Sequence, residues 1–163
     1  MKTLQKNRIE TIKIKQELDT DPDLSWLGTY AKHPAGPNTR DREERGECGR
    51  NEFRYFNCGD NYKGSSAEDM KKYCEQDYQR AEQFNSGYWW MIGIKAEAIL
   101  YVEGVRQAVT SGGLWGIESD SDKKSLAEVG AEQLAELVTI LKSLGFHGRA
   151  IAKHCPKDTE PQE

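Results

Sequence analysis

The amino-acid sequence predicts an α+β fold, with an antiparallel sheet of about four strands and two main helices packed on it. The first observation is a β-rich run over residues 89–111 that is interrupted by Glu103-Gly104, a dipeptide typical of a two-residue hairpin turn. The second is a pair of segments, residues 66–85 and 123–144, whose apolar side chains recur every three or four positions. We therefore expect a single α+β domain over residues 1–154.

Composition and charge narrow the class of protein. The chain has 163 residues, with 23 basic and 27 acidic side chains and a net charge of −4. A nucleic-acid-binding domain usually carries a basic excess, so binding to nucleic acid is not expected. No apolar stretch approaches the roughly 20 residues that span a bilayer, and the first residues lack the hydrophobic core of a secretory signal. The expectation is a cytoplasmic protein without membrane association.

The N-terminal third predicts short strands separated by a long loop. Ile12 and Ile14 alternate with polar residues within 8–16, which indicates a strand with one apolar face. Residues 33–50 hold prolines and glycines followed by a dense mixture of arginines and acids, which indicates a long, charged and solvated loop. A second strand is expected near residues 52–57.

Both predicted helices have recognisable ends. Ser66 and Asp69 have the spacing of a capping box for the first helix, and Ser125 and Glu128 have it for the second. Gly130 interrupts the apolar stripe of the second helix, so we expect close packing at that position.

The ends of these helices are also predicted to use glycine. Gly87 and Gly145 should terminate the two helices in the left-handed conformation, with Phe146 packed back on the last turn of the second. Residues 155–163 contain two prolines and are expected to form a frayed tail.

The register of the hairpin follows from its side-chain pattern. A pairing of Val102 with Val105 also places Leu100 opposite Gln107 and Glu97 opposite Thr110. One face then collects the apolar side chains of Trp90, Ile92, Ile94, Ala98, Leu100, Val102, Val105 and Val109. The other face carries Lys95, Glu97, Tyr101, Arg106 and Thr110.

The spacing of the four cysteines matches no zinc-binding pattern. They are Cys48, Cys58, Cys74 and Cys155. Four reduced thiols are expected, because nothing in the sequence directs the chain to an oxidising compartment. No arrangement of His, Ser and Cys resembles a catalytic triad, so neither a catalytic residue nor a metal or cofactor is expected.

The most distinctive segment is SGGLWG at residues 111–116. Gly112 and Gly113 allow positive φ and close backbone approach, and Trp115 follows them. One interpretation is a bulge or tight bend that places Trp115 on the sheet, and the other is a partner-binding loop anchored by Trp115. A nucleotide site is disfavoured, because the loop lacks the spacing and the lysine of a phosphate-binding loop.

Acidic residues follow this loop. Glu118, Asp120 and Asp122 are spaced as in a calcium-binding loop, but Lys123 and Val129 stand where that loop needs Gly and Glu. Acids that precede a helix commonly cap its free N–H groups, which is the simpler interpretation. Glu118 and Asp120 also remain candidates for binding.

Two further acids lie within predicted elements. Asp77 interrupts the apolar stripe of the first helix, and Glu97 lies on the hairpin. A buried acid is costly unless it is paired, so each should find an Arg, a Lys or a Tyr hydroxyl, with Arg80 or Arg106 as the obvious partner.

The aromatic run at residues 88–90 supplies the remaining candidates. Neighbours on a strand point to opposite faces, so only one of Trp89 and Trp90 can belong to the core. The pattern assigns Trp90 to the core and Trp89 to the second face, together with Tyr101. Unless that face is covered, Trp89 and Tyr101 form an exposed patch of the kind found at interfaces.

Several segments together resemble a known group of proteins. They are DPDLSWLGTY at 21–30, NYKG at 61–64, CEQDYQRAEQFNSGYW at 74–89, GIKAEA at 93–98 and SGGLWGIESDSD at 111–122. Their order and spacing are similar to those of small proteins of phages, prophages and plasmid-borne regions. The resemblance covers roughly residues 10–150. It implies a mobile-element setting and no particular activity.

The leading hypothesis is a non-enzymatic binding protein of a phage or mobile element that acts on a host protein, with inhibition of a host defence system as one form. The alternative is a small enzyme or small-ligand-binding domain with an acidic pocket formed by Asp77, Glu97, Glu118 and Asp120. A third interpretation is nucleic-acid binding through Arg40, Arg42, Arg45, Arg50 and Arg54, which requires the intervening acids to point away. The sequence does not indicate the oligomeric state.

Overall fold

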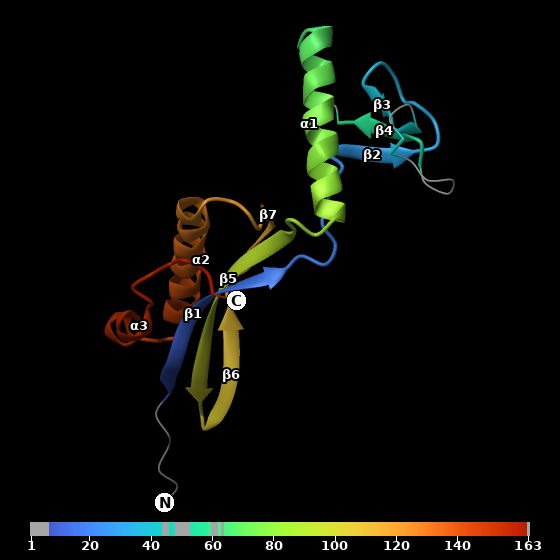
Figure 1. The fold of residues 1–163 in the computed structure, drawn as a ribbon. Coiled ribbons are helices and arrows are strands. Elements are labelled where there is room, and N and C mark those ends of the chain that lie inside the picture. The colour runs from blue at the N-terminus through green and yellow to red at the C-terminus, as the bar shows by residue number, and fades with distance from the viewer. Residues whose placement is uncertain (1–6, 44–45, 48–52, 60–61, 63, 163) are drawn as a thin grey trace, which may run out of the picture. The chain divides into compact units, whose positions relative to one another are not determined.

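The computed structural model describes residues 7–43, 46–47, 53–59, 62 and 64–162. Within these ranges it contains three helices and two antiparallel sheets, which confirms the α+β class (Figure 1). Residues 1–20 and 90–163 form one compact unit, here called the terminal unit, and residues 21–89 form a second, the central unit. The expectation of a single domain over residues 1–154 stays a prediction, and each unit is described by itself.

None of the helices in the described ranges has the length and hydropathy needed to cross a membrane.

A four-stranded antiparallel sheet forms the centre of the terminal unit. The long strand β5 (Met91–Val102) pairs along one edge with β1 (Arg8–Leu18). Its other edge pairs first with β7 (Leu114–Glu118) and then with β6 (Val105–Thr110). The number of strands in this sheet agrees with the sequence prediction.

The hairpin formed by β5 and β6 has the predicted register. Val102 lies opposite Val105, and Glu97 lies opposite Thr110. The turn residues Glu103 and Gly104 have φ angles of 53° and 84°. Positive values at both positions define a type I′ turn, whose twist matches that of the flanking strands.

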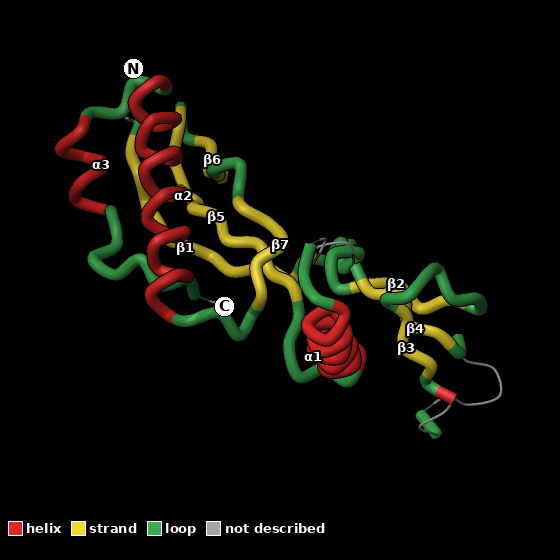
Figure 2. The backbone as a smooth tube through the Cα atoms, turned by 90° about the horizontal axis from the view of Figure 1, so that it is seen from above, coloured by secondary structure: helices red, strands yellow, loops and turns green. Residues whose placement is uncertain are grey.

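The helices of the terminal unit cover one face of its sheet. Helix α2 (Lys123–Ser143) and helix α3 (Gly148–His154) lie on the same side of β1 and β5 (Figure 2). The core between them consists of Ile9, Ile12, Ala96, Ala98, Leu100, Leu137, Leu141 and Ile151. Each such aliphatic side chain contributes about 1.5–3 kcal/mol when it is fully buried. No helix among the described residues of this unit lies on the opposite face.

The ends of α2 agree in part with prediction. Asp122 caps the helix by accepting the N–H of Ser125 at 3.0 Å, so the predicted capping box of Ser125 and Glu128 is wrong. The reason is that the Asp122 carboxylate accepts both the amide and the hydroxyl of Ser125, which leaves Ser125 one turn inside the helix. At the other end Gly145 has a φ of 87° and Phe146 donates its N–H to the carbonyl of Leu141, as predicted.

The C-terminal segment is ordered against the sheet, so the prediction of a frayed tail over residues 155–163 is wrong for the described part. Gln162 donates its N–H to the carbonyl of Ile14 at 3.1 Å and accepts the N–H of Gln16 at 3.0 Å. The outer edge of β1 offers unpaired peptide groups, and the tail satisfies them. A Cβ at Gly130 would lie 2.1 Å from the carbonyl oxygen of Thr159, so the glycine permits this close packing.

The central unit contains a smaller sheet. Strand β4 (Tyr55–Cys58) lies between β2 (Gly28–Ala31) and β3 (Thr39–Asp41), and helix α1 (Ala67–Asn85) packs on all three. The sequence assigned this helix to the sheet of the hairpin, whereas in the structure it belongs to the central unit and packs on the smaller sheet. The buried side chains of the unit include Leu27, Phe56, Cys74, Tyr78 and Trp89.

The local features of α1 were predictable. Ser66 caps the helix by accepting the N–H of Asp69 at 3.1 Å, and Gly87 follows it with a φ of 73°. The strand near residues 52–57 is confirmed as β4. Part of the predicted loop over residues 33–50 is instead ordered, because β3 lies inside it.

A disulfide joins Cys58 at the end of β4 to Cys74 on α1, so the expectation of reduced thiols is wrong for this pair. Their Cα atoms lie 5.4 Å apart, within the range that a disulfide bridges. The pairing depends on how α1 packs on β4, which the cysteine spacing does not reveal. Cys155 is a free, half-buried thiol, and burial raises its pKa. Cys48 lies outside the described residues.

Candidate functional site

Trp115 is one of the candidate residues that are exposed. It is 47% exposed, yet its ring packs closely on β5. A Cβ at Gly93 would lie 2.3 Å from Cε3 of Trp115, so the indole rests directly on the glycine. The pairing of β5 with β7 shifts register between Ile92 and Ile94, which is the bulge that the glycine-rich loop predicts.

The peptide groups of the glycine-rich loop are held by helix α2. Gly112 donates its N–H to Oε1 of Glu136 at 3.0 Å, and Gly113 donates its N–H to Oε1 of Gln133 at 2.9 Å. Ser111 is buried and accepts the N–H of Ala96 through Oγ. Because a carboxylate already uses the N–H of Gly112, the loop is not open for an anion. These bonds fix the position of Trp115.

The acids that follow the loop lie at the end of β7. Glu118 is paired with Met91 in the ladder and is half-buried, whereas Asp120 is exposed in the turn before α2. Ser119 between them accepts the N–H of Trp90 through Oγ at 3.0 Å. Among the described residues, no group of three or more His, Cys, Asp or Glu side chains is arranged to hold a metal ion.

The face of the sheet opposite α2 and α3 carries ion pairs between β1 and β5. Glu97 pairs with Lys15 at 2.6 Å, and Lys95 pairs with Glu17 at 2.7 Å across the β1–β5 ladder. The half-buried ring of Tyr101 lies under the guanidinium of Arg8, 4.6 Å from the ring centroid. The prediction that Glu97 finds a cationic partner is therefore confirmed, and that partner is Lys15.

The assignment of the two tryptophans is the reverse of the prediction. Trp89 is 1% exposed, whereas Trp90 is 42% exposed. The strand begins at Met91, so the alternation of strand faces does not extend to these residues. Trp89 instead packs edge-on against Phe84 and donates its Nε1–H to the carbonyl of Arg80 at 3.0 Å. Trp89 is thus a core residue of the central unit with almost no exposed surface.

Asp77 is also a buried residue of the central unit. It is 6% exposed, and one of its oxygens accepts the hydroxyl of Tyr62 at 3.0 Å. The other carboxylate oxygen has no hydrogen-bond partner among the described residues. Burial raises the pKa of Asp77, against the smaller effect of the Tyr62 hydrogen bond. A Tyr hydroxyl was one of the predicted partner types, whereas neither Arg80 nor Arg106 is its partner.

These positions leave the acidic pocket without support. Glu118 lies beside Met91, the first residue of β5, whereas Glu97 lies six residues further along this strand. At about 3.4 Å per residue, this separation is on the order of 20 Å.

Two cavities lie among the described residues, and neither is lined by the candidate acids. One of about 300 Å³ in the central unit is lined by Pro37, Asn38, Thr39, Arg40, Asp41, Lys71, Cys74 and Glu75. One of about 420 Å³ in the terminal unit is lined by Asn7, Leu144, Gly145, Phe146, His147 and Ala150.

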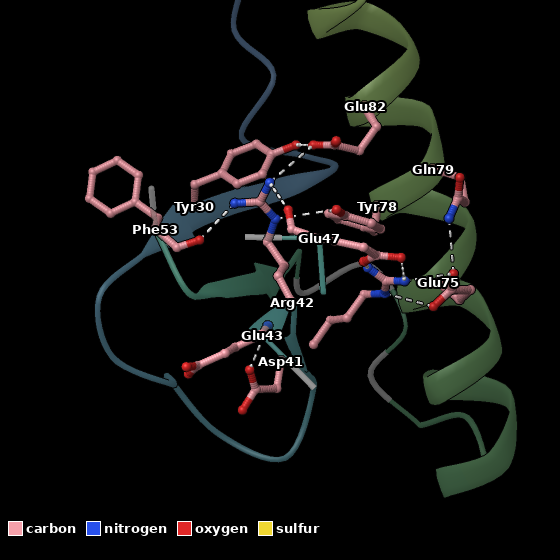
Figure 3. Close-up of polar contacts among 11 residues, drawn as sticks. Tyr30, Asp41, Arg42, Glu43, Glu47, Phe53, Glu75, Tyr78, Gln79 and Glu82 are labelled. Carbon is pink, nitrogen blue, oxygen red and sulfur yellow. Dashed lines mark hydrogen bonds and ion pairs between the residues drawn. The ribbon is translucent and has the colours of Figure 1, made fainter. Parts of the chain in front are cut away.

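Two arginines of the predicted charged loop are buried. Their burial was not predicted from the sequence. Arg40 is 7% exposed and Arg42 is 6% exposed. Figure 3 shows the guanidinium of Arg42 close to the side chains of Tyr30, Tyr78 and Glu47. Two guanidinium groups with little exposure require several partners each, because an unpaired buried charge is very costly.

Arg40 is held by two carboxylates. Its Nε donates to Glu75 at 2.8 Å, its Nη1 and Nη2 donate to Glu47, and its guanidinium stacks on the ring of Tyr78 at 3.7 Å. Burial alone would lower the pKa of Arg40, but the hydrogen bonds to Glu47 and Glu75 raise it overall. The charge is fully compensated within the unit.

Arg42 is held mainly by neutral groups. It donates to the carbonyl of Phe53 at 2.7 Å, to the carbonyl of Glu47 at 3.1 Å and to the hydroxyl of Tyr78 at 3.2 Å. Arg54 is half-exposed and pairs with Asp41 and Glu43. The acids therefore point toward these arginines, contrary to what nucleic-acid binding through them requires. Arg45 and Arg50 lie outside the described residues.

Comparison with known proteins adds no assignment: no family model, curated protein or solved structure matches the chain. The functional argument consequently rests on the geometry. The surface that the geometry favours is formed by Trp115, whose indole is 47% exposed and lies on Gly93. We call this exposed part of β7 the Trp115 surface.

Proposed function

We propose that the protein is a non-enzymatic binding protein of a phage or mobile element, and that it docks on a host protein through the Trp115 surface. The observation that carries the proposal is the fixed position of a half-exposed indole on Gly93. Tryptophan is enriched among the residues that dominate binding energy at protein interfaces. A large ring that is already immobilised loses little conformational entropy when a partner covers it.

The surroundings of Trp115 support binding rather than catalysis. The N–H groups of Gly112 and Gly113 are occupied by α2, and Glu97 is occupied by Lys15. These groups hold the loop and the sheet in place. They leave the indole of Trp115 as the exposed apolar feature of this surface.

The host setting rests on the resemblance to mobile-element proteins, and inhibition of a host defence system is the form of action we favour. An inhibitor of this kind would act in the host cytoplasm. The Cys58–Cys74 disulfide tests this location independently, because the cytosol keeps most thiols reduced. A reducing cytoplasm would open this disulfide, so rapid alkylation of cells that produce the protein, followed by mass spectrometry, should find Cys58 and Cys74 alkylated in the cells and disulfide-linked in the oxidised, purified protein. Recovery of the intact disulfide would instead place the protein in an oxidising compartment.

Capture from host lysate tests the function. Wild-type protein, Trp115→Ala and Trp90→Ala are compared as baits at equal concentration, with circular dichroism to confirm the fold of each. Trp90 is a matched control, because it lies in the same unit and is exposed to a similar extent. We expect the host partner with wild type and Trp90→Ala, and a loss of at least tenfold with Trp115→Ala, about 1.4 kcal/mol or more. Equal recovery by all three baits would contradict the proposed surface.

The defence-inhibition part has its own test. Host cells that carry an active defence system are infected with a sensitive phage, with or without the protein. Wild-type protein should restore phage plating and Trp115→Ala should not. If wild type restores nothing across several defence systems, the protein binds its host partner for another purpose.

A further inference from the structure

The outer edge of β6 is the exposed edge of the terminal unit's sheet. Among the strands that the structure describes, β6 pairs with β5 alone, and five of the six residues of β6 are exposed. The opposite edge of the sheet, on β1, is covered by the C-terminal tail at Gln162. Proteins usually protect such edges with proline, lysine, bulges or covering segments, because unpaired peptide groups attract other strands. The sequence of β6, VRQAVT, contains neither proline nor lysine.

The hydrogen-bonding direction of each residue in β6 follows from the hairpin. In a two-residue hairpin, the residues that flank the turn form a hydrogen-bonded pair, so Val105, Gln107 and Val109 direct their peptide groups to β5. Ser111 has the same parity, and its N–H donates to the carbonyl of Ala96 on β5 at 2.9 Å. The peptide groups of Arg106, Ala108 and Thr110 therefore point outward.

We propose that β6 pairs antiparallel with β6 of a second copy of this chain, about a two-fold axis at Ala108. The outward-pointing residues are themselves symmetric about Ala108. In this register Ala108 faces Ala108 of the other copy, and Arg106 faces Thr110 of the other copy. Three hydrogen-bonded pairs form, each with two bonds, and every outward peptide group of β6 finds a partner. Such a self-complementary interface closes as a dimer.

The residues around the axis favour a second copy as the occupant. The small side chain of Ala108 leaves room for its equivalent at the axis. The strand is flanked by Gly104 and Gly112, which lie equally far from Ala108 and face each other across the interface in this register. No Cβ therefore stands at either end of the new ladder.

The charges also favour this register. Glu97 lies beside Thr110 on the second face, so Arg106 of the other copy lies two strands from Glu97, about 10 Å between backbones. The two Arg106 side chains are separated by four residues along the strand, about 14 Å between backbones, which salt screens strongly. Opposite charges are thus closer than like charges. No charged residue of β6 faces another charged residue across the axis.

Sedimentation of the full chain over a wide range of concentration tests the dimer. Main-chain pairing of one short strand buries little surface, so association should be weak and visible at high micromolar concentration. Wild type should shift from the mass of one chain to that of two. Ala108→Pro removes an outward N–H, which an edge strand tolerates, and should weaken association by at least tenfold. A wild type that stays at the mass of one chain, or a proline variant that associates equally well, would overturn the proposal.

Cross-linking tests the register without relying on the proline variant. The Cα atoms of a hydrogen-bonded antiparallel pair lie about 5.5 Å apart, which suits a disulfide. Under mild oxidation, Ala108→Cys should form disulfide-linked dimers many times faster than wild type, whose own cysteines set the background. Thr110→Cys is the matched control, because each Thr110 faces Arg106 and not its own equivalent. Equal rates for the two variants would overturn the two-fold axis at Ala108.

Discussion

The indole of Trp115 takes the place that a side chain at position 93 would occupy. A Cβ on Gly93 would lie within 2.3–2.6 Å of three ring atoms of Trp115, distances that no real contact shows. The packing of Trp115 on β7 therefore requires glycine at position 93 of β5. An aromatic ring that covers a glycine on the neighbouring strand protects the backbone there and gains a fixed orientation.

Gly93→Ala should therefore displace the indole. The methyl group overpacks the site, so we expect the free energy of unfolding to fall by about 1–3 kcal/mol and the tryptophan emission to shift to the red. Host-partner binding should fall as it does with Trp115→Ala. Gly148→Ala is the control, because a Cβ there meets nothing within 4 Å. Unchanged emission and binding in Gly93→Ala would show that the ring has another stable position.

Asp77 makes the stability of the central unit depend on pH. Burial raises its pKa above the usual 3.8, so the folded chain holds this proton to a higher pH than the unfolded chain. In that window the unfolded state binds fewer protons, and the contribution of Asp77 to stability decreases as the pH rises through the raised pKa. Acidification from neutral pH toward about 4 should remove this destabilising contribution.

Asp77→Asn tests the effect. The amide carries no charge and can still accept the Tyr62 hydroxyl, so the variant should be more stable than wild type at neutral pH by about 1 kcal/mol. The difference should shrink as the pH is lowered. Tyr62→Phe removes the hydrogen bond that opposes the shift, so it should strengthen the pH dependence. Melting curves across this pH range measure both effects, and parallel curves for wild type and Asp77→Asn would contradict the assignment.

The C-terminal tail is held at Gly130. The Cβ of Gly130→Ala would meet the carbonyl oxygen of Thr159 at 2.1 Å, so the variant should release the tail from β1. Alanine is more favourable than glycine in a helix by about 1 kcal/mol. This gain should offset the lost contacts of the tail, so the free energy of unfolding should change little. Hydrogen exchange at the Gln16 N–H, which donates to Gln162, should nevertheless become roughly tenfold faster. Lys123→Ala, which removes an exposed pair with Glu160, should leave this rate nearly unchanged. An unaltered rate in Gly130→Ala would show that the tail adapts.

Much of the terminal unit could be predicted from the sequence because its signals are local. The period-two pattern determines which side chains of β5 and β6 face the core, and the Glu103-Gly104 turn then leaves one register. The terminating Gly145 acts within a few positions of itself, as does the capping residue Ser66 in the central unit. Such features depend on residues that are neighbours in the chain.

The errors concern contacts between distant segments. Burial of Trp89 depends on α1, and the order of the tail depends on the free edge of β1. The Cys58–Cys74 pair and the position of Arg40 require knowing that α1 packs on β2, β3 and β4. In the sequence, Arg40 lies among acids and prolines, and this composition is typical of a solvated loop. A signal that could have revealed the burial of Arg40 is the row of acids along α1, such as Glu75 and Glu82, which face the arginines of this segment.

Arg40→Lys tests whether the buried arginine stabilises the central unit through its shape. The guanidinium reaches Glu75 through Nε and Nη2, at 2.8 and 3.2 Å, and reaches Glu47 through its other edge while its plane stacks on Tyr78. An ammonium group is a single point charge and cannot hold two carboxylates in this arrangement. We therefore expect a loss of about 2 kcal/mol in the free energy of unfolding, although the charge is conserved.

Arg54→Lys is the matched control for this experiment. Arg54 also binds two acids, Asp41 and Glu43, but its side chain is 46% exposed, so water can replace the contacts that lysine does not make. Urea unfolding of the full chain should give a lower midpoint for Arg40→Lys and a midpoint close to wild type for Arg54→Lys. Equal shifts in the two variants would mean that burial adds nothing to the arginine geometry at position 40. A larger shift in Arg54→Lys would mean that the exposed pair, not the buried one, holds β3 in place.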